Sequence, residues 1–177
     1  MSSLEHTSVP AWARGRRSRT AAASPREGGN RHLLVGVGTA GRAQVAAWED
    51  AADVPAEVVL ADTAADVGLD AALAAPHVGV RIRIAAPVGD CLQLRAAAVT
   101  AGVEDDELEL RPTGHGPISL YCSHCSAVTN VEAAVDDVVA CRGCGRELLV
   151  YYHVSRNTGR FLGFQHDAER IPGTEVS

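Results

Sequence analysis

The stretch HLLVGVGTAGRAQVAAWEDAADVPAEVVLAD, residues 32–62, alternates short apolar runs with a longer Ala-rich segment. Residues 32–38 form an apolar run that ends in glycines, as a buried parallel strand does, and residues 56–62 form a second such run. Between them, residues 41–51 carry Val45 and Trp48 three positions apart, which predicts a helix. A strand, a helix and a second strand in this order predict parallel strands joined by a crossover.

The alternation continues to about residue 112. Residues 63–75 predict a second helix and residues 78–87 a third strand. Residues 88–102 predict a third helix that ends at Gly102, and residues 106–110 a short edge strand. We therefore predict that residues 31–112 form a small Rossmann-like α/β domain with a parallel sheet and helices.

Glycines are spaced as G-x-G-x-x-G where the first predicted strand meets the first predicted helix. They are Gly36, Gly38 and Gly41, and Asp62 closes the second strand about twenty residues later. In this context the motif predicts a turn that cradles a phosphate, with an acid for a ribose hydroxyl, and NADPH is the candidate cofactor. The alternative is that the glycines only allow the helix to pack closely on the strands.

The composition changes after the linker RPTGHGP, residues 111–117. Residues 118–122, 147–155 and 160–166 read as short strands. The turn sequence Asn157-Thr158-Gly159 lies between the last two, which predicts a hairpin. We predict that residues 113–177 form a small β domain that needs a stabilising cross-link, because so short a unit has too small a core to be stable alone.

Two Cys-x-x-Cys pairs can supply this cross-link by binding a metal ion. Cys122, Cys125, Cys141 and Cys144 have the spacing C-x2-C-x15-C-x2-C, which predicts tetrahedral all-sulfur binding of one Zn²⁺ or iron ion. Four protein thiolates leave no open position for water or substrate, so the site serves either as a structural clamp or as an outer-sphere electron carrier. Ser126 stands where a rubredoxin-like loop prefers Gly, which favours the clamp, and His124 is expected to point outward.

Charge and hydropathy narrow the choice of partners. The chain has a net charge of −6 and its basic residues are all Arg; six of these lie in residues 1–31. We predict a disordered Arg-rich leader over residues 1–30, and the acidic remainder argues against nucleic acid as the main partner. Neither a membrane-spanning run nor a signal peptide is apparent, so we predict a cytoplasmic protein with no membrane partner. Thiols stay reduced in the cytoplasm, where paired cysteines indicate metal binding rather than disulfides.

The sequence around and after the cysteines resembles a known family. YCSHC, followed by CRGCGRELLVYYHVSRNTGRFLGFQHDAE, is similar to the C-terminal region of the DmmA-like subunits of dimethylamine monooxygenase. Those subunits carry a four-cysteine ribbon followed by a motif of the type L-V-x-x-H-V-S-R, Y/F-L-G-F and D-A-E. The matching positions here are Leu149, Val150, His153, Val154, Ser155, Arg156, Phe161, Leu162, Gly163, Phe164, Asp167, Ala168 and Glu169.

The region before the linker resembles a second family. Residues 80–110 look like the last strand, helix and strand of the pyridine-nucleotide domain in ferredoxin-reductase-like flavoenzymes. Those enzymes usually have Cys-Gly-Pro at the strand end, whereas this chain has Ala85-Ala86-Pro87 and no flavin-binding barrel before the domain. Hydride transfer by this chain alone is therefore not expected.

The resemblance to the DmmA-like subunits implies that this chain is an accessory, non-catalytic subunit of an amine monooxygenase of the dimethylamine type, which depends on haem and NADPH. The implied partners are a haem-containing catalytic subunit and a flavin/iron–sulfur reductase subunit. Aromatic and charged side chains on or beyond the hairpin are the predicted partner interface: His153, Arg156, Phe161, Phe164, Asp167 and Glu169. The alternatives are that these aromatics form the core under the metal, that the chain is a zinc-ribbon protein adaptor, or that it is an NADPH-dependent reductase component.

Overall fold

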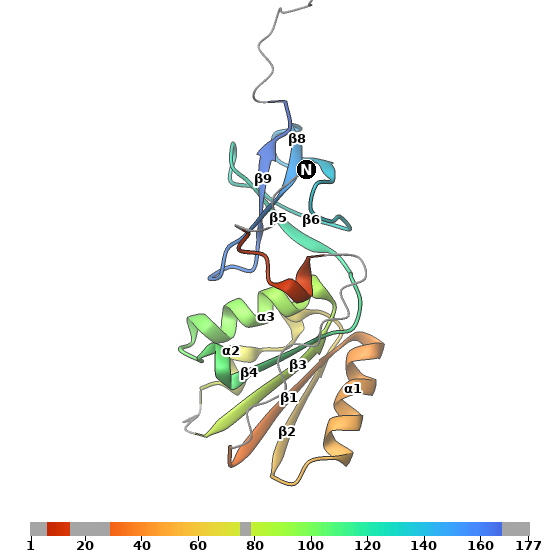
Figure 1. Cartoon of the computed structure of the whole chain (residues 1–177), viewed down its shortest axis with the longest axis vertical. Coiled ribbons are helices and arrows are strands. Elements are labelled where there is room, and N and C mark those ends of the chain that lie inside the picture. Colours follow the sequence, from red (N-terminus) through yellow and green to blue (C-terminus); the bar gives the residue numbers. More distant parts are fainter. Residues whose placement is uncertain (1–6, 15–28, 75–78, 168–177) are drawn as a thin grey trace, which may run out of the picture.

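The computed structural model describes residues 7–14, 29–74 and 79–167, which form two sheets stacked along the long axis of the molecule (Figure 1). The first sheet has the order β2-β1-β3-β4, and all of its strand pairs are parallel. Its strands are β1 (Arg31–Val37), β2 (Ala56–Ala61), β3 (Val80–Ala86) and β4 (Leu108–Pro112). The predicted α/β fold with a parallel sheet is confirmed, and β4 is the expected edge strand.

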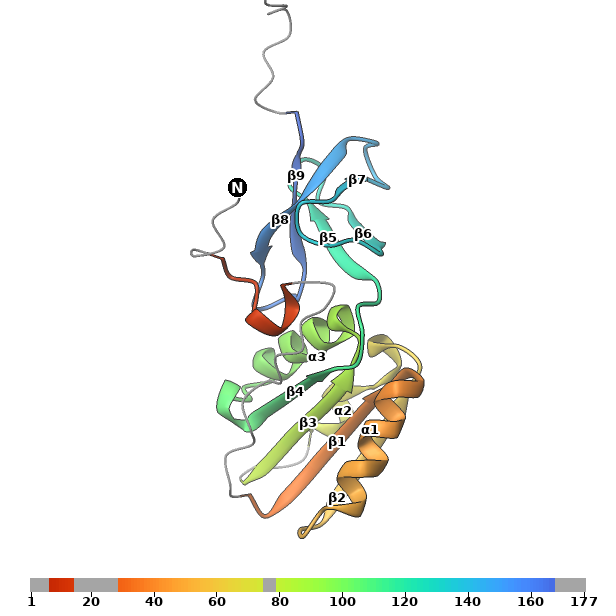
Figure 2. The same ribbon diagram turned by 45° about the vertical axis from the view of Figure 1, so that its right-hand side comes forward.

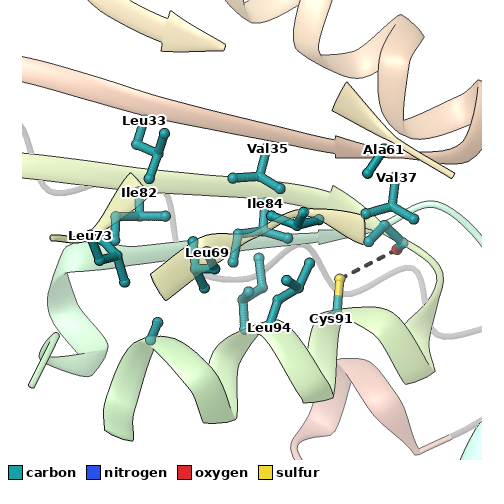
Figure 3. Packing of buried hydrophobic residues seen from close by; sticks show 14 of the residues in the cluster. Leu33, Val35, Val37, Ala61, Leu69, Leu73, Ile82, Ile84, Cys91 and Leu94 are labelled. Carbon is teal, nitrogen blue, oxygen red and sulfur yellow. Dashed lines mark hydrogen bonds between the residues drawn. The ribbon is translucent and has the colours of Figure 1, made fainter. Parts of the chain in front are cut away.

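Helices cover both faces of the first sheet. Helix α1 (Gly38–Asp50) packs Val45 and Trp48 on one face, against Leu34 and Ala85. On the other face, α2 (Leu69–Ala72) and α3 (Val88–Thr100) cover the larger core. Figure 3 shows this core, in which side chains of β1 and β3 meet those of the two helices. Both faces of β1 are buried, which explains why its sequence is a continuous apolar run rather than an alternating one.

The prediction of a second helix over residues 63–75 is wrong in its extent. The structure has a 3-10 turn at Ala64–Asp66 and the four-residue α2, with Gly68 between them at φ 61°. A left-handed residue interrupts the helical hydrogen-bond ladder, and Gly adopts that conformation without steric penalty. The Ala-rich composition indicated helix, but Gly68 divides the segment.

The second sheet is mixed and has the order β6-β5-β9-β8-β7. Its strands are β5 (Ile118–Cys122), β6 (Val128–Val131), β7 (Val138–Ala140), β8 (Glu147–Val154) and β9 (Phe161–Gln165). β8 and β9 form the predicted antiparallel hairpin, while β5 and β9 pair in parallel. The sequence did not predict β6 and β7, because strands this short carry little periodic signal.

A bulge interrupts the pairing of β8 with β9. Val150 pairs with Gly163 and Val154 with Phe161, so three residues of β8 lie opposite Leu162 alone. Extra residues in one strand break the alternation of side chains and redirect them. The three residues are Tyr151, Tyr152 and His153, and their rings gather together with centroids 4.1–5.2 Å apart.

Residues 7–14 differ from the leader predicted over residues 1–30. They lie beside α3 and the second sheet (Figures 1 and 2), with Val9 and Ala13 buried in the second core. The Thr7 hydroxyl donates to the Tyr152 carbonyl, and the Ser8 hydroxyl bonds both the carbonyl and the N–H of Val154. This part of the predicted leader is therefore an ordered strap along β8.

The two sheets share a hydrophobic core across α3. Val88 and Leu92 of α3 belong to the same buried cluster as Leu120, Val150 and Phe161 of the second sheet. The β8–β9 turn lies directly on this helix: a Cβ built on Gly159 would be 2.4 Å from the Leu92 carbonyl oxygen. Within the described residues, no helix has the length and apolarity needed to cross a membrane.

Candidate metal centre

The two cysteine pairs form two turns of the same geometry. In the first, the Cys122 N–H donates to the Ala127 carbonyl and the Ser126 N–H to the Cys122 carbonyl. In the second, Cys141 exchanges the equivalent bonds with Arg146 and Gly145. Ser126 and Gly145 occupy matching positions and both have positive φ, 62° and 72°. The first turn therefore holds a Ser in a conformation that favours Gly, so the backbones of the two turns agree although their residues at this position differ.

The four sulfur atoms fit a tetrahedral metal ion. All four lie within 4.8 Å of one another, and among the described residues they form the one group of three or more metal-ligating side chains. Cys122 Sγ is 3.9 Å from Cys144 Sγ, and Cys125 Sγ is 3.6 Å from Cys141 Sγ. A tetrahedral site with metal–sulfur bonds of about 2.3 Å needs sulfur–sulfur distances of about 3.8 Å. The spacing is far longer than the roughly 2.05 Å of a disulfide. His124 is exposed and outside the group, as expected.

Backbone N–H groups support the thiolate form of Cys141. The N–H groups of Cys144 and Gly143 donate to Cys141 Sγ, and these bonds lower the pKa of the thiol to about 6. A metal ion binds the thiolate, so a thiol that is already deprotonated near neutral pH is a favourable first ligand. Gly143 also lies where a side chain does not fit: its Cβ would be 2.6 Å from Ala127 Cβ and 3.0 Å from Cys125 Sγ.

Gly143→Ala is therefore expected to weaken metal binding by at least tenfold, because the added methyl group pushes the two turns apart. Gly145→Ala is the matched control in the same turn, since its Cβ would meet nothing within 4 Å although its φ is 72°. The control should lose about 1 kcal/mol of stability from backbone strain and keep its metal affinity. Competition with a colorimetric chelator measures both affinities, and equal losses in the two variants would contradict the steric role of Gly143.

The arrangement of the four ligands limits the chemistry of the site. Cys122 and Cys141 are buried in the second core, whereas Cys125 is exposed. Four thiolates complete the coordination shell, so substrate has no position at the metal. The site can hold the two turns together, and with iron it can exchange electrons through the exposed Cys125 edge.

The residues predicted at a partner interface are dispersed. Phe161 is buried in the second core (2% exposed), whereas Phe164 is 42% exposed on the opposite face of β9. Arg156 forms an ion pair with Asp105, which precedes β4 of the first sheet, with the two groups 2.9 Å apart, and Asp167 accepts a hydrogen bond from Gln165. The His153 ring lies 3.4 Å from the Ser8 hydroxyl, and Glu169 lies outside the described residues. Phe161 thus belongs to the core under the metal, which was the alternative interpretation of the aromatics.

The glycine motif turns tightly from β1 into α1. A Cβ on Gly41 would be 2.4 Å from the Ala85 carbonyl oxygen, so this Gly is needed for helix packing. Gly38 has φ 66° and open space where a Cβ would lie, and Gly36 packs against Gly41. Asp62 is paired with Arg42, 2.7 Å apart. Two of the three glycines therefore have a packing role, while Gly38 alone leaves room beside the backbone.

The neighbouring strand end is covered by the linker. The Thr113 N–H donates to the Ala86 carbonyl, and the Val88 N–H at the start of α3 donates to the Gly114 carbonyl. In open parallel sheets, ligands bind outside the carboxyl ends of the strands where the strand order reverses, here between β1 and β3. Residues 113–114 thus lie over the β3 half of that crevice.

Cys91, the fifth cysteine, has a structural position. It is fully buried in the first core, its thiol donates to the Ala86 carbonyl (Figure 3), and burial raises the pKa of the thiol to about 12. A thiol in such surroundings is protonated and inert.

Residues 119–164 match the family described as "Dimethylamine monooxygenase subunit DmmA-like, C-terminal domain". The match includes all four cysteines, the β8 bulge and the β8–β9 hairpin. No curated protein and no solved structure matches the chain.

Proposed function

We propose that this chain is a small accessory subunit of a multi-component, haem-dependent amine monooxygenase of the dimethylamine type. Its four-cysteine site stabilises the subunit and the surface by which it docks, and it relays electrons if it holds iron. The partners would be a haem-containing catalytic subunit and a flavin/iron–sulfur reductase subunit. The observation that carries the proposal is the family match of residues 119–164 over a closed four-thiolate site.

The structure favours a role in assembly over one in catalysis. Two of the four metal ligands, Cys122 and Cys141, are part of the same core that joins the second sheet to α3, so the metal would hold the surfaces of both sheets in one arrangement. Exposed apolar side chains lie on β7 and β9: Val138 is 43% exposed and Phe164 is 42% exposed. Val138 pairs with Leu149 and Leu149 pairs with Phe164, so the three side chains form one apolar row across the outer face. Such a row is a suitable docking surface for another subunit.

Metal analysis with an absorption spectrum separates the clamp from the electron relay. We expect one metal ion per chain in protein purified under reducing conditions. A colourless zinc-loaded protein that still assembles into an active complex would exclude the relay, whereas a red ferric-thiolate spectrum would support it. A chain that folds equally well without any metal would contradict the clamp.

Copurification of the tagged chain with a haem-containing subunit tests the assembly itself. Phe164→Ser should weaken this association while leaving the free energy of unfolding nearly unchanged, because the side chain is exposed in the isolated chain. The absence of any haem-containing partner would favour the alternative of a zinc-ribbon adaptor.

An NADPH-dependent reductase component is the second candidate. The open space beside Gly38 and the position of Asp62 after β2 favour it, while the Arg42 pair and the covered end of β3 oppose it. Failure of the isolated chain to bind NADPH at millimolar concentration would exclude this function.

A further inference from the structure

A polar hollow of about 410 Å³ lies where α3 meets the outer face of the second sheet. The β8–β9 turn supplies Asn157, Thr158 and Arg160 to its lining, β6 supplies Asn130, and α3 supplies Gln93. Small-molecule sites occur preferentially at boundaries between domains, and this hollow has the size of such a site.

The lining of this hollow is suited to an anion. It contains no carboxylate, although the chain as a whole has a net charge of −6. The buried Ser119 hydroxyl donates to Asn130 Oδ1 at 2.8 Å, which leaves the Asn130 amide N–H groups free to donate to a ligand. The amides of Gln93 and Asn157 and the Thr158 hydroxyl are further donors.

Arg160 supplies the positive charge. Its guanidinium makes no ion pair or hydrogen bond with another residue in the part of the chain that the structure describes. Most other described Arg side chains are engaged: Arg42, Arg83, Arg95 and Arg156, for example, each pair with an acid. A guanidinium surrounded by amide and hydroxyl donors is the arrangement that binds phosphate oxygens.

A second hollow, of about 400 Å³, adjoins the first and shares Thr158 and Arg160 with it. Its lining includes Tyr121 of β5 and Leu162 of β9, which face each other across the strand pair, and His153 from the bulge in β8. These side chains provide an apolar and aromatic surface, against which a planar ring can stack. Arg160 thus lies between a polar hollow and an apolar one.

We propose that the two hollows together bind a small organic phosphate that carries a planar ring. The phosphate lies against Arg160, Asn130 and Gln93, and the ring lies over Tyr121 and Leu162. This binding is independent of the proposed monooxygenase role, because all of the residues that carry it belong to one chain and none is a metal ligand.

Titration of the full-length, metal-loaded chain with adenosine monophosphate tests the proposal, with inorganic phosphate and adenosine as partial ligands. Calorimetry measures affinity, and NMR shifts of the Asn130, Asn157 and Gln93 side-chain amides locate the site. We expect the nucleotide to bind at least tenfold more tightly than either partial ligand. Arg160→Ala should weaken its binding by at least tenfold, because two or more charge-assisted hydrogen bonds are lost.

Arg142→Ala is the matched control, because Arg142 is also exposed and has no side-chain partner among the described residues but lies in the second cysteine turn. It should leave binding unchanged. Asn130→Asp, which keeps the shape of the side chain and replaces donors by a negative charge, should abolish binding while the protein remains folded. The proposal is overturned if the nucleotide does not saturate the protein at millimolar concentration, or if Arg160→Ala and Arg142→Ala weaken it equally. The proposal is also overturned if Arg160→Ala weakens subunit assembly without weakening nucleotide binding. Arg160 would then pair with a carboxylate of a partner subunit.

Discussion

Cys141→Ser is expected to abolish metal binding and to unfold the second sheet. Cys141 is buried, belongs to the second core, and is the thiol that accepts two backbone N–H groups. Binding of a structural zinc ion in small domains contributes about 10–16 kcal/mol, more than the whole stability of a typical domain, about 5–15 kcal/mol. Limited proteolysis should therefore cleave residues 113–167 rapidly, and metal content should fall to zero.

The first sheet should survive this substitution with reduced stability. Its main core lies on the sheet side of α3 and does not include the cysteine turns. However, Val88 and Leu92 would lose the apolar partners that cover them. Cys91→Ala is the control, since it removes a buried sulfur from the first core and leaves the metal ligands intact; it should keep one metal ion per chain and an uncleaved second sheet. An unchanged proteolysis pattern for Cys141→Ser would contradict the structural role of the metal.

Local patterns made much of this structure predictable. The spacing of the four cysteines places two sulfur atoms on each turn, so the metal group follows from residues that are close in sequence. The strand β1 is recognisable because both of its faces are covered and its sequence is apolar from Leu33 to Val37, whereas β3 keeps an apolar run only at its end and carries Arg81 and Arg83 before it. The β8–β9 hairpin follows from its turn residues, with Gly159 at φ 65°.

The remaining features depend on contacts between residues that are distant in sequence. Val9 is buried only because α3 and the second sheet meet beside it, and nothing in residues 7–14 indicates that. Phe161 and Phe164 are both apolar residues of one strand, and the sheet alone decides that the first is core and the second is surface. Arg160 lies between two hollows because the β8–β9 turn packs on α3, which no motif shows. In the sequence, the clearest signals of these features are the aromatic run at residues 151–153 and the Gly in the turn.

Gly159→Ala is expected to disrupt the contact between the two sheets. The added Cβ would lie 2.4 Å from the Leu92 carbonyl oxygen and 2.8 Å from the Gln93 nitrogen. Both contacts are to the backbone of α3, which cannot rotate away as a flexible side chain can. The turn must therefore lift from the helix, which separates apolar groups of the shared core such as Leu92 and Phe161. We expect a loss of about 3 kcal/mol, the sum of overpacking and left-handed backbone strain.

Gly102→Ala isolates the backbone part of this loss. Gly102 has φ 94° at the end of α3, and its Cβ would meet nothing within 4 Å. This variant should lose about 1 kcal/mol, because only the strain of a left-handed residue is added. Urea unfolding measures both losses, and small-angle scattering should show a more extended molecule for Gly159→Ala alone. Metal content should stay at one ion per chain in both variants, because neither glycine is near the cysteine turns in the sequence or bonded to them. Equal losses in the two variants would mean that the β8–β9 turn does not press on α3 in solution.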